Sequence, residues 1–550
     1  MQYHPQVTSN TSIRSPISYL TMSRVRPSLQ DVCDRYTSGE DRTTLENIVR
    51  AFRRLQQLDP SNEDSFFTIA GYHGEPWMKE NPYPGGSTYD DWRGGYCQHQ
   101  TVLFPTWHRA YLLRLEDAMR RAVPDAPSLA LPFLDECRPF DQNTPLPWIL
   151  TTPTFDLDGD NTNPLYSYKF QKGVADNHEK PSDAQRYSKS TGSQTARYPL
   201  AGVTSLDGED PASHARILNG NIAAWLNGKI HIDGKASPTS IPDTVSIVSR
   251  YKASLDAPNY TLFSNKASRG EWLRNTKGSL ESKFHTSLED PHNAVHLAIG
   301  GFYQDGEENA KPVEGAHGDM GENETASFDP IFFLHHAFID YVFWTWQVKH
   351  GLTKPGSLSV EPNITAGTLS AGSPVLPPGS KLEMSSPLAP FLKSGCINDP
   401  VFYTSDDITD ISQLGYMYGE GSLDLLTSGP VLGDPELPLV AVARVSGIST
   451  TDHEGSFVIR TSAKLADGSE VEIDRDAILS RWVLANCKNC QKNKLETYTY
   501  IPFGEDLMRA IGAETKEDIH SKLTVSVQTR GQTAPVKNSF SAVQPLIEIF

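Results

Sequence analysis

The sequence lacks the features of several protein classes. No run of about 18 apolar residues occurs anywhere, so we expect neither a transmembrane helix nor a membrane partner. Basic residues are in the minority, and a net charge of −18 makes nucleic acid a poor candidate partner. The first thirty residues lack the apolar centre of about 7 to 15 residues that a secretory signal needs, which predicts a cytoplasmic protein. A small or neutral ligand fits these properties better.

Cysteine is also scarce, because six residues among 550 are too few for a disulfide framework. Four of the six are far apart along the chain, whereas Cys487 and Cys490 form a C-x-x-C pair. In a reducing compartment such a pair is more often a metal or redox site than a structural bridge. A zinc half-site and a redox dithiol are therefore both open interpretations of this pair.

The residue pattern divides the chain into two parts. Apolar residues recur every three or four positions over residues 29–125 and in later segments up to residue 350, which predicts a mainly α-helical domain. Residues 131–213 indicate loops over a core, and the Ser, Gly and Pro of residues 369–391 indicate a surface linker. From residue 438 apolar and polar residues alternate, as in an antiparallel sheet or sandwich. We therefore expect a helical domain over residues 1–430 and a β-sandwich-like domain over residues 431–550.

Four histidines late in the helical part have a spacing suited to a metal. His292 and His296 lie one turn apart in PHNAVHLAIGG, so their imidazoles project from one face of a helix. His335 and His336 lie in the apolar segment FDPIFFLHHAFIDYVFWTW, where a buried imidazole needs a partner. Taken singly, each is more simply explained as a core histidine bonded to a carbonyl. The four together favour a metal site, and their spacing does not choose between His335 and His336.

A second group of histidines lies upstream. His73 stands in FFTIAGYHGEPW, His99 in GGYCQHQ, and His108 in the amphipathic segment LFPTWHRAYLLRLEDAM. His99 and His108 would face opposite sides of one straight helix, so His99 must come from a loop. Three neutral imidazoles suit copper and leave a coordination position open. Zinc is the alternative on ligand count, but it does not explain two paired triads beside Cys97.

These motifs resemble those of the fungal-type tyrosinases, members of the binuclear type-3 copper family that also contains catechol oxidases and haemocyanins. The resemblance rests on EDSFFTIAGYHGEPW, GGYCQHQTVLFPTWHRAYL, PHNAVHLAIGG, GDMGENETASFDPIFFLHHAFIDYVFWTWQ and the later ANCKNCQ. It implies a helical catalytic domain in which a four-helix bundle holds two copper ions that bind O2 between them. The implied ligands are His73, His99 and His108 for one copper ion and His292, His296 and His336 for the other.

The resemblance also assigns roles next to these ligands. It implies a thioether bond between Cys97 and His99, which would fix the ring of a ligand that comes from a loop. It leaves His335 as a structural or supporting residue, and it places Asp340 where its carboxylate would orient the imidazole of His336.

Two polar residues flank the first ligand of the second triad. In similar tyrosinases a glutamate and an asparagine at the positions of Glu289 and Asn293 are proposed to hold a water molecule that deprotonates the phenol. The simpler interpretation of Glu289 is a charge at a helix N-terminus, and the two roles are compatible.

The end of the chain resembles the shielding domain of latent proenzymes. The resemblance pairs Arg26 with the tyrosines of Tyr416–Tyr418 and places the end of the catalytic core after Tyr418. It implies a bulky residue over the copper ions, for which the candidates are Phe457, Trp482 and Tyr500. Cys487 and Cys490 would be a copper-loading pair, which suits soft Cu(I).

The expected activity is O2-dependent ortho-hydroxylation of phenols and oxidation of catechols to ortho-quinones by a latent proenzyme. The expected partners are a phenolic substrate, O2, a copper chaperone and an activating protease. A catechol or ortho-aminophenol oxidase without the first step is one alternative. A haemocyanin-like O2 carrier is another, although an acidic single chain with a covering domain argues against it.

Overall fold

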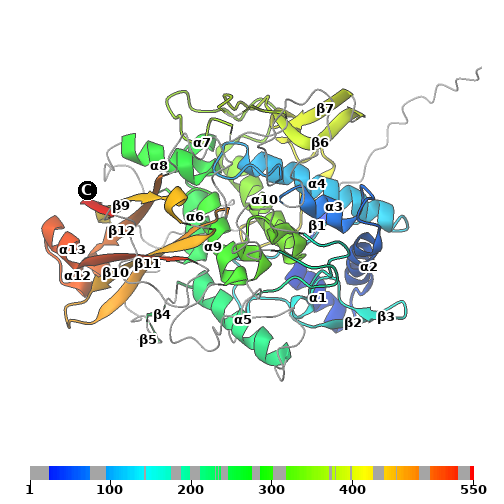
Figure 1. The fold of residues 1–550 in the computed structure, drawn as a ribbon, viewed down its shortest axis with the longest axis horizontal. Coiled ribbons are helices and arrows are strands. Elements are labelled where there is room, and N and C mark those ends of the chain that lie inside the picture. The colour runs from blue at the N-terminus through cyan, green and yellow to red at the C-terminus, as the bar shows by residue number, and fades with distance from the viewer. Residues whose placement is uncertain are drawn as a thin grey trace, which may run out of the picture.

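The computed structural model describes residues 24–74, 95–141, 144–174, 188–197, 211–228, 231–232, 235–236, 246–275, 285–301, 318–370, 375–377, 379–396, 399–424, 439–453, 455–481, 496–529 and 545–550. A large helical part occupies the middle and one side of the molecule, and the C-terminal strands lie on the opposite side (Figure 1). Within the described residues, no helix has both the length and the apolar character needed to cross a membrane.

Four helices open the helical part, and their buried faces follow the predicted periodicity. They are α1 (Leu29–Ser38), α2 (Thr43–Gln57), α3 (Phe66–Gly71) and α4 (Phe104–Ala122). In α2 the buried apolar residues are three or four positions apart, including Leu45, Ile48 and Phe52. The side-chain oxygen of Ser65 accepts the backbone N–H of Thr68 and so caps α3, which ends two residues before the predicted metal ligand His73.

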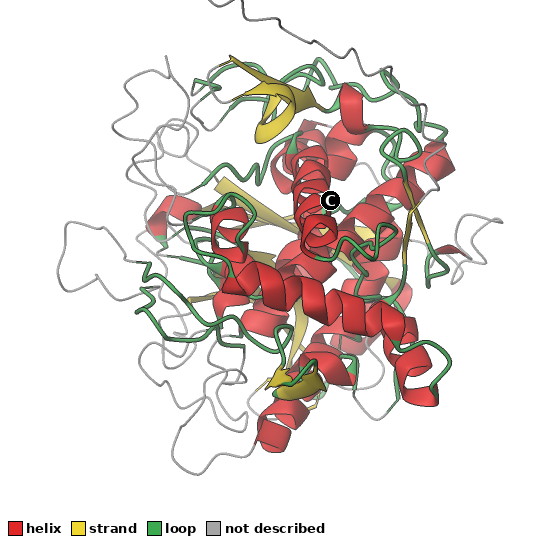
Figure 2. Ribbon diagram, turned by 90° about the vertical axis from the view of Figure 1, so that its right-hand side faces the viewer, coloured by secondary structure: helices red, strands yellow, loops and turns green. Residues whose placement is uncertain are grey.

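The middle of the chain adds further helices and short hairpins. The helices are α5 (Pro211–Leu226), α6 (Ile247–Ser254), α7 (Tyr260–Ser264), α8 (Lys266–Asn275), α9 (Glu289–Gly300) and α10 (Ile331–His350). The two hairpins pair β2 (Thr154–Leu157) with β3 (Asp160–Thr162) and β4 (His231–Ile232) with β5 (Lys235–Ala236). Viewed from the side, the helices gather at the centre of the molecule with loops around them (Figure 2).

Helix α10 is the core element of this part. It is apolar around its whole circumference, and every residue from Ile331 to Phe343 is buried. It ends at Gly351, whose φ of +69° suits the left-handed closing position of a helix.

Residues 369–391 differ from the surface linker that their composition predicts. Leu382, Leu388 and Phe391 are buried in the core of the helical part, and Trp107 in α4 donates its indole N–H to the carbonyl of Ala389 over 2.8 Å. The stretch leads into a hairpin of β6 (Pro387–Cys396) and β7 (Asp399–Thr404). Its spaced apolar residues anchor it, and the Ser, Gly and Pro residues supply the turns between them.

The N-terminal strand β1 (Arg24–Arg26) pairs in parallel with β8 (Tyr416–Tyr418). The Arg26 guanidinium lies 3.9 Å from the ring centroid of Tyr416, in the stacking arrangement that the resemblance implied. The chain continues to pack on the helical part beyond Tyr418, because Leu423 is buried and Tyr341 donates its hydroxyl to Asp424 over 2.7 Å. The predicted boundary at residue 430 lies outside the described residues.

The C-terminal part contains two three-stranded antiparallel sheets. One has the order β11 (Glu470–Ile478), β10 (Phe457–Lys464), β13 (Leu523–Thr529), and the other has the order β12 (Glu496–Gly504), β9 (Leu439–Ser449), β14 (Leu546–Ile549). Two short helices, α12 (Glu505–Ile511) and α13 (Lys516–Lys522), connect β12 to β13. Side chains of both sheets share one apolar core, as in the predicted sandwich.

Buried ion pairs join the two parts. Arg250 of α6 lies 2.5 Å from the carboxylate of Asp474 in β11, and Lys266 of α8 lies 2.5 Å from that of Asp476. Val458 and Ala477 of the same sheet belong to the apolar core of the helical part. The sandwich therefore contacts the helical part through apolar residues and paired charges.

Candidate metal centre

Three separate segments supply the upstream histidines. His73 follows α3, His108 lies in α4, and His99 comes from a loop, as predicted. The loop passes very close to His73, because a Cβ atom at Gly95 would lie 2.1 Å from the backbone oxygen of His73. One ring nitrogen of each of the three histidines lies within 4.8 Å of the others.

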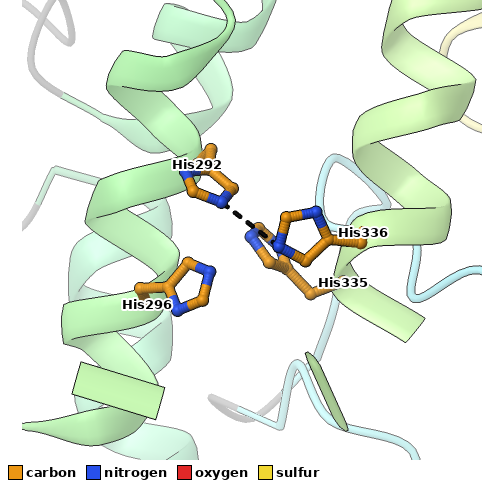
Figure 3. Close-up of side chains that lie close together, drawn as sticks. All are labelled: His292, His296, His335 and His336. Atoms are coloured by element: carbon orange, nitrogen blue, oxygen red, sulfur yellow. Dashed lines mark hydrogen bonds between the residues drawn. The ribbon is translucent and has the colours of Figure 1, made fainter. Parts of the chain in front are cut away.

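The downstream histidines face one another across two helices. His292 and His296 project from α9 toward His335 and His336 of α10 (Figure 3), and these four residues also bring one nitrogen each within 4.8 Å. The two groups are adjacent, since the rings of His108 and His336 stack with centroids 4.3 Å apart. The six predicted ligands thus lie in one buried cluster.

The hydrogen bonds of these imidazoles leave the same nitrogen available. The Nδ1 atoms of His73, His108 and His296 lie 3.2, 2.8 and 2.7 Å from the backbone oxygens of Asn323, Phe104 and Met320. An imidazole that donates from Nδ1 keeps its lone pair on Nε2, as metal-bound histidines usually do. The Nε2 atoms of His73, His99, His108 and His296 have no hydrogen-bond partner among the described residues.

Burial keeps these imidazoles neutral. It lowers the pKa of His108 to about 3, and burial together with the neighbouring histidines holds the pKa values of His73, His99, His292, His296 and His336 well below their usual range. Neutral imidazole is the form that binds a metal ion, so the cluster is ready for ligation near neutral pH.

The structure distinguishes the two histidines of α10. The Nε2 atom of His336 lies 3.3 Å from that of His292, which is about the separation of two nitrogens that share one metal ion at ~2.0–2.1 Å from each. The Nδ1 atom of His335 lies 2.6 Å from the carboxyl of Glu136, and the hydroxyl of Tyr251 donates to the other oxygen of that carboxyl over 2.5 Å. His336 fits the ligand position, and Glu136 anchors His335 beside it.

The expected contact between Asp340 and His336 is wrong. The Asp340 carboxylate accepts hydrogen bonds from Arg26, Arg109, Tyr416 and Tyr418 over 2.5–2.8 Å. Two guanidinium groups outcompete a neutral imidazole for a buried carboxylate, and they lower the pKa of Asp340. Asp340 therefore ties α10 to α4, β1 and β8 rather than orienting a ligand.

Glu289 and Asn293 lie in the first turn and a half of α9, beside the predicted ligand His292. The Asn293 side-chain oxygen lies 2.9 Å from Nδ1 of His292. The Glu289 carboxylate accepts the backbone N–H groups of Gln100 over 2.7 Å and Lys266 over 3.0 Å. Burial raises the pKa of Glu289 to about 7. Since Gln100 follows His99, Glu289 connects the helix of the second histidine group to the loop of the first.

Cys97 lies beside His99, with its Sγ atom 3.7 Å from the ring Nδ1. Two other polar side chains approach the sulfur, with Asn323 Nδ2 at 4.0 Å and Arg481 Nη2 at 3.3 Å. Sequence reasoning missed Arg481 and Glu136, because no spacing or periodicity relates either residue to the histidines. Glu136 follows Asp135 in LPFLDEC, where only its carboxyl type could have suggested an imidazole partner.

Two of the three residues that were candidates for covering the copper ions lie within the described part of the chain. Phe457 is buried in the core of the sandwich, and Tyr500 packs on α8, where its hydroxyl donates to the carbonyl of Gly270 over 3.2 Å. Trp482, Cys487 and Cys490 lie outside the described residues.

The donor set fits two adjacent metal ions. Both groups consist of neutral imidazoles that are buried except for the half-buried His99, and five of the Nε2 atoms lack a hydrogen-bond partner among the described residues. Nitrogen donors of intermediate softness suit copper, and three ligands per ion leave a position open for a further ligand. The fold and the site thus define a protein with a binuclear histidine metal centre.

Comparison with known proteins identifies the family. Residues 63–349 match the family described as the common central domain of tyrosinase. The chain is 37% identical over 537 residues to a tyrosinase from Hahella sp., covering 93% of each chain. It is 36% identical over 527 residues to a tyrosinase from Aspergillus oryzae, covering 88% of this chain and 91% of that one. The chain belongs to the tyrosinase family and is a copper-dependent enzyme that oxidises phenols with O2.

Solved structures agree with this assignment. Tyrosinase from Burkholderia thailandensis at low pH superposes with a TM-score of 0.75 and 35% identity, over 96% of this chain and 100% of that one. A pro-tyrosinase from Aspergillus oryzae, with a TM-score of 0.61 and 18% identity over 97% and 93% of the two chains, shows the same fold. Both similarities extend over the helical and the C-terminal parts.

Proposed function

We propose that this enzyme ortho-hydroxylates monophenols as well as oxidising ortho-diphenols to ortho-quinones. The observation that supports the first activity is Glu289, a buried carboxyl group whose pKa is raised to about 7. A base with a pKa near the working pH is suited to removing a phenolic proton. Asn293, next to the ligand His292, supplies an amide that can hold a water molecule between base and substrate.

The residues around the metal centre have different roles. His73, His99 and His108 would hold one copper ion, and His292, His296 and His336 the other. Copper supplies the redox chemistry that reduces O2 and oxidises the phenol. The backbone oxygens of Asn323, Phe104 and Met320 orient the imidazoles, and Phe332, whose ring centroid lies 4.1 Å from that of His336, contributes an apolar wall that excludes water.

The test is oxygen uptake by the copper-loaded chain with a monophenol and with a catechol, together with a metal analysis. We expect two copper ions per chain and uptake with both substrates. Uptake with catechol alone would favour the catechol oxidase alternative, and reversible O2 binding without turnover would favour a carrier.

We also propose that the C-terminal sandwich keeps the intact chain latent. The support is the interface, where Arg250 and Lys266 pair with Asp474 and Asp476, and where Arg481 reaches the residue beside a copper ligand. A domain docked over the centre would exclude phenols without displacing the histidines. An activating protease would then release the enzyme.

The site of cleavage follows from the packing. The sequence predicts an activated product that ends between about residues 380 and 435. Leu382, Leu388, Phe391 and Leu423 are buried in the core of the helical part, so a cut before residue 425 would damage it, and we place the activating cut between residues 425 and 435. The measurement is catechol oxidation before and after limited proteolysis, with the new terminus read by mass spectrometry. Equal rates for the intact and trimmed chains would contradict latency. A copper chaperone as partner and a copper-loading role for Cys487 and Cys490 stay predictions. The rate of copper transfer to a Cys487→Ser variant tests them, and we expect it to be lower than the rate for the unchanged chain.

A further inference from the structure

One side chain of the C-terminal part reaches the first histidine group. Arg481 stands three residues after the end of β11, and its Nη2 atom lies 3.3 Å from the Sγ atom of Cys97. After burial and the neighbouring histidines, the Arg481 guanidinium is a further cause of the lowered pKa values of His73 and His99. The contact joins residues 384 positions apart and crosses the interface between the two parts.

The backbone before Arg481 is firmly held. Ser480 donates its backbone N–H to Ser456 Oγ over 3.1 Å, and Ser456 Oγ–H donates to the Ser480 carbonyl over 3.2 Å. Leu479 and Ser480 are both buried. Two positions before Ile478, Asp476 is paired with Lys266 of the helical part. The guanidinium of Arg481 is therefore presented to Cys97 by a fixed segment rather than by a free loop.

The sulfur of Cys97 lies among three polar groups. Arg481 approaches at 3.3 Å, Asn323 Nδ2 lies at 4.0 Å, and His99 Nδ1 lies at 3.7 Å. A thiol has three staggered χ1 positions, and a donor that contacts the sulfur in one of them favours that position. In the position shown, the sulfur faces the His99 ring, whose Cε1 carbon is bonded to Nδ1.

We propose that Arg481 is a positioning residue for the covalent bond between Cys97 and His99, and that this bond therefore forms while the C-terminal part is still docked. The inference rests on the thioether that the resemblance implies and on the copper and O2 chemistry of the enzyme. In the step, the S–H bond of Cys97 and one ring C–H bond of His99 break and an S–C bond forms. The two electrons and two protons pass to O2, which becomes H2O2.

Arginine suits this role better than other residues. Its planar guanidinium presents several N–H donors in a rigid fork and has no acceptor, so it contacts the sulfur and cannot accept the Nδ1–H of a His99 ring that binds the metal through Nε2. Restricting the Cys97 thiol to one of three rotamers raises the population of the rotamer that faces His99 by up to about threefold. A better orientation of the sulfur toward the ring carbon would add to this gain. We therefore expect Arg481→Met to slow the formation of the bond about threefold or more, and Arg481→Lys to restore part of the rate.

The experiment follows the bond directly in the full chain. The purified chain is loaded with two equivalents of copper in air, and the peptide containing residues 97–99 is followed over time by mass spectrometry for the loss of two hydrogens. Arg481→Met and Arg481→Lys are compared with the unchanged chain. Arg509→Met is the matched control, because Arg509 lies in α12 of the same part and its side chain is 75% exposed.

Each outcome has one meaning. Slow bond formation in Arg481→Met with two copper ions bound, partial rescue by Arg481→Lys and an unchanged rate in Arg509→Met would support the proposal. An unchanged rate in Arg481→Met would overturn it and leave the proposed function intact. If the unchanged chain binds two copper ions and oxidises catechol but never loses the two hydrogens, there is no bond to position, and the proposal fails together with the thioether alone. Failure to bind copper would instead contradict the proposed function.

Discussion

Glu289→Gln is the substitution that best separates the two activities. It keeps the size of the side chain but removes the base, and one of its two oxygens becomes an NH2 group. The carboxylate accepts N–H groups from Gln100 and Lys266, so the amide can satisfy only one of them. The other backbone N–H then faces a donor, which costs about 1–3 kcal/mol.

The raised pKa of Glu289 has the opposite effect on the relative stability of the variant. A carboxyl with a pKa of about 7 in the folded chain, against an ordinary value of 4.5, takes up a proton on folding. Its contribution to stability is present below pH 4.5 and is lost as the pH rises through 7, which amounts to ~3 kcal/mol. The glutamine escapes this loss. We therefore expect Glu289→Gln to be as stable as the unchanged chain or more stable by up to about 2 kcal/mol at pH 8, and less stable by about 1–3 kcal/mol at pH 5.

The kinetic effect is larger and selective. A positioned general base contributes about 10²–10⁴-fold, so kcat/KM for a monophenol should fall by about a hundredfold or more. Catechol is more acidic and needs less help, so we expect its kcat/KM to fall less than tenfold. In the unchanged enzyme the monophenol reaction should rise with pH to a plateau, with a midpoint below 7 because two copper cations favour the carboxylate. The variant should lose this rise.

The assay needs a control for the change of a carboxylate to an amide. Glu271 of α8 also accepts two backbone N–H groups, from Thr365 and Ala366 over 2.7 and 2.5 Å, but both bonds are made to one carboxylate oxygen. Glu271→Gln can keep both bonds, so it should change stability little and leave the ratio of the two activities unchanged. A parallel fall of both activities in Glu289→Gln, or an unaltered pH profile, would show that Glu289 only holds the loop of His99.

Three further outcomes are expected. His296→Ala should bind fewer than two copper ions and lose catechol oxidation with the fold retained, and full activity would contradict the ligand assignment. Asp340→Asn should destabilise the helical part by about 3–5 kcal/mol near neutral pH, as read by urea unfolding, and the difference should shrink as the pH falls from about 4 through the lowered pKa of this carboxylate. Lys266→Met removes the closest cation from the Asp476 carboxylate and leaves it Arg250 at 3.9 Å, so it should raise the catechol activity of the intact chain at least tenfold, whereas equal rates would refute a latching role for the pair.

The sequence was sufficient for the parts of the site that repeat locally. His292 and His296 share a helix face because of their spacing, and the distance between His99 and His108 required a loop. The alternation after residue 438 predicted the C-terminal sheets for the same reason. In each case a periodicity of the backbone determines which side chains lie together.

Composition and proximity along the chain were poorer guides. Asp340 lies one turn beyond His336, yet Arg26, more than 300 positions away, takes its carboxylate because a buried charge is satisfied by an opposite charge first. Residues 369–391 have the composition of a linker, but a few buried apolar residues among them determine where they lie. Neither result follows from local pattern, since each depends on what the fold brings near.

The ion pairs between the two parts likewise do not follow from local sequence pattern, and one of them makes docking of the C-terminal part depend on pH. Arg250 and Asp474 come from different parts, and no spacing relates them. Burial raises the pKa of Asp474 to about 6, although Arg250 opposes the shift. If undocking returns this pKa to its ordinary value of 3.8, docking takes up a proton between about pH 4 and 6, and this group favours the docked state as the pH falls. Activation of the intact chain by acid would then require other carboxylates to release it. Asp474→Asn stays neutral at every pH and removes the cost of docking an ionised carboxylate, so it should make activation at pH 5 harder to reach, and easier activation of the variant would contradict this role.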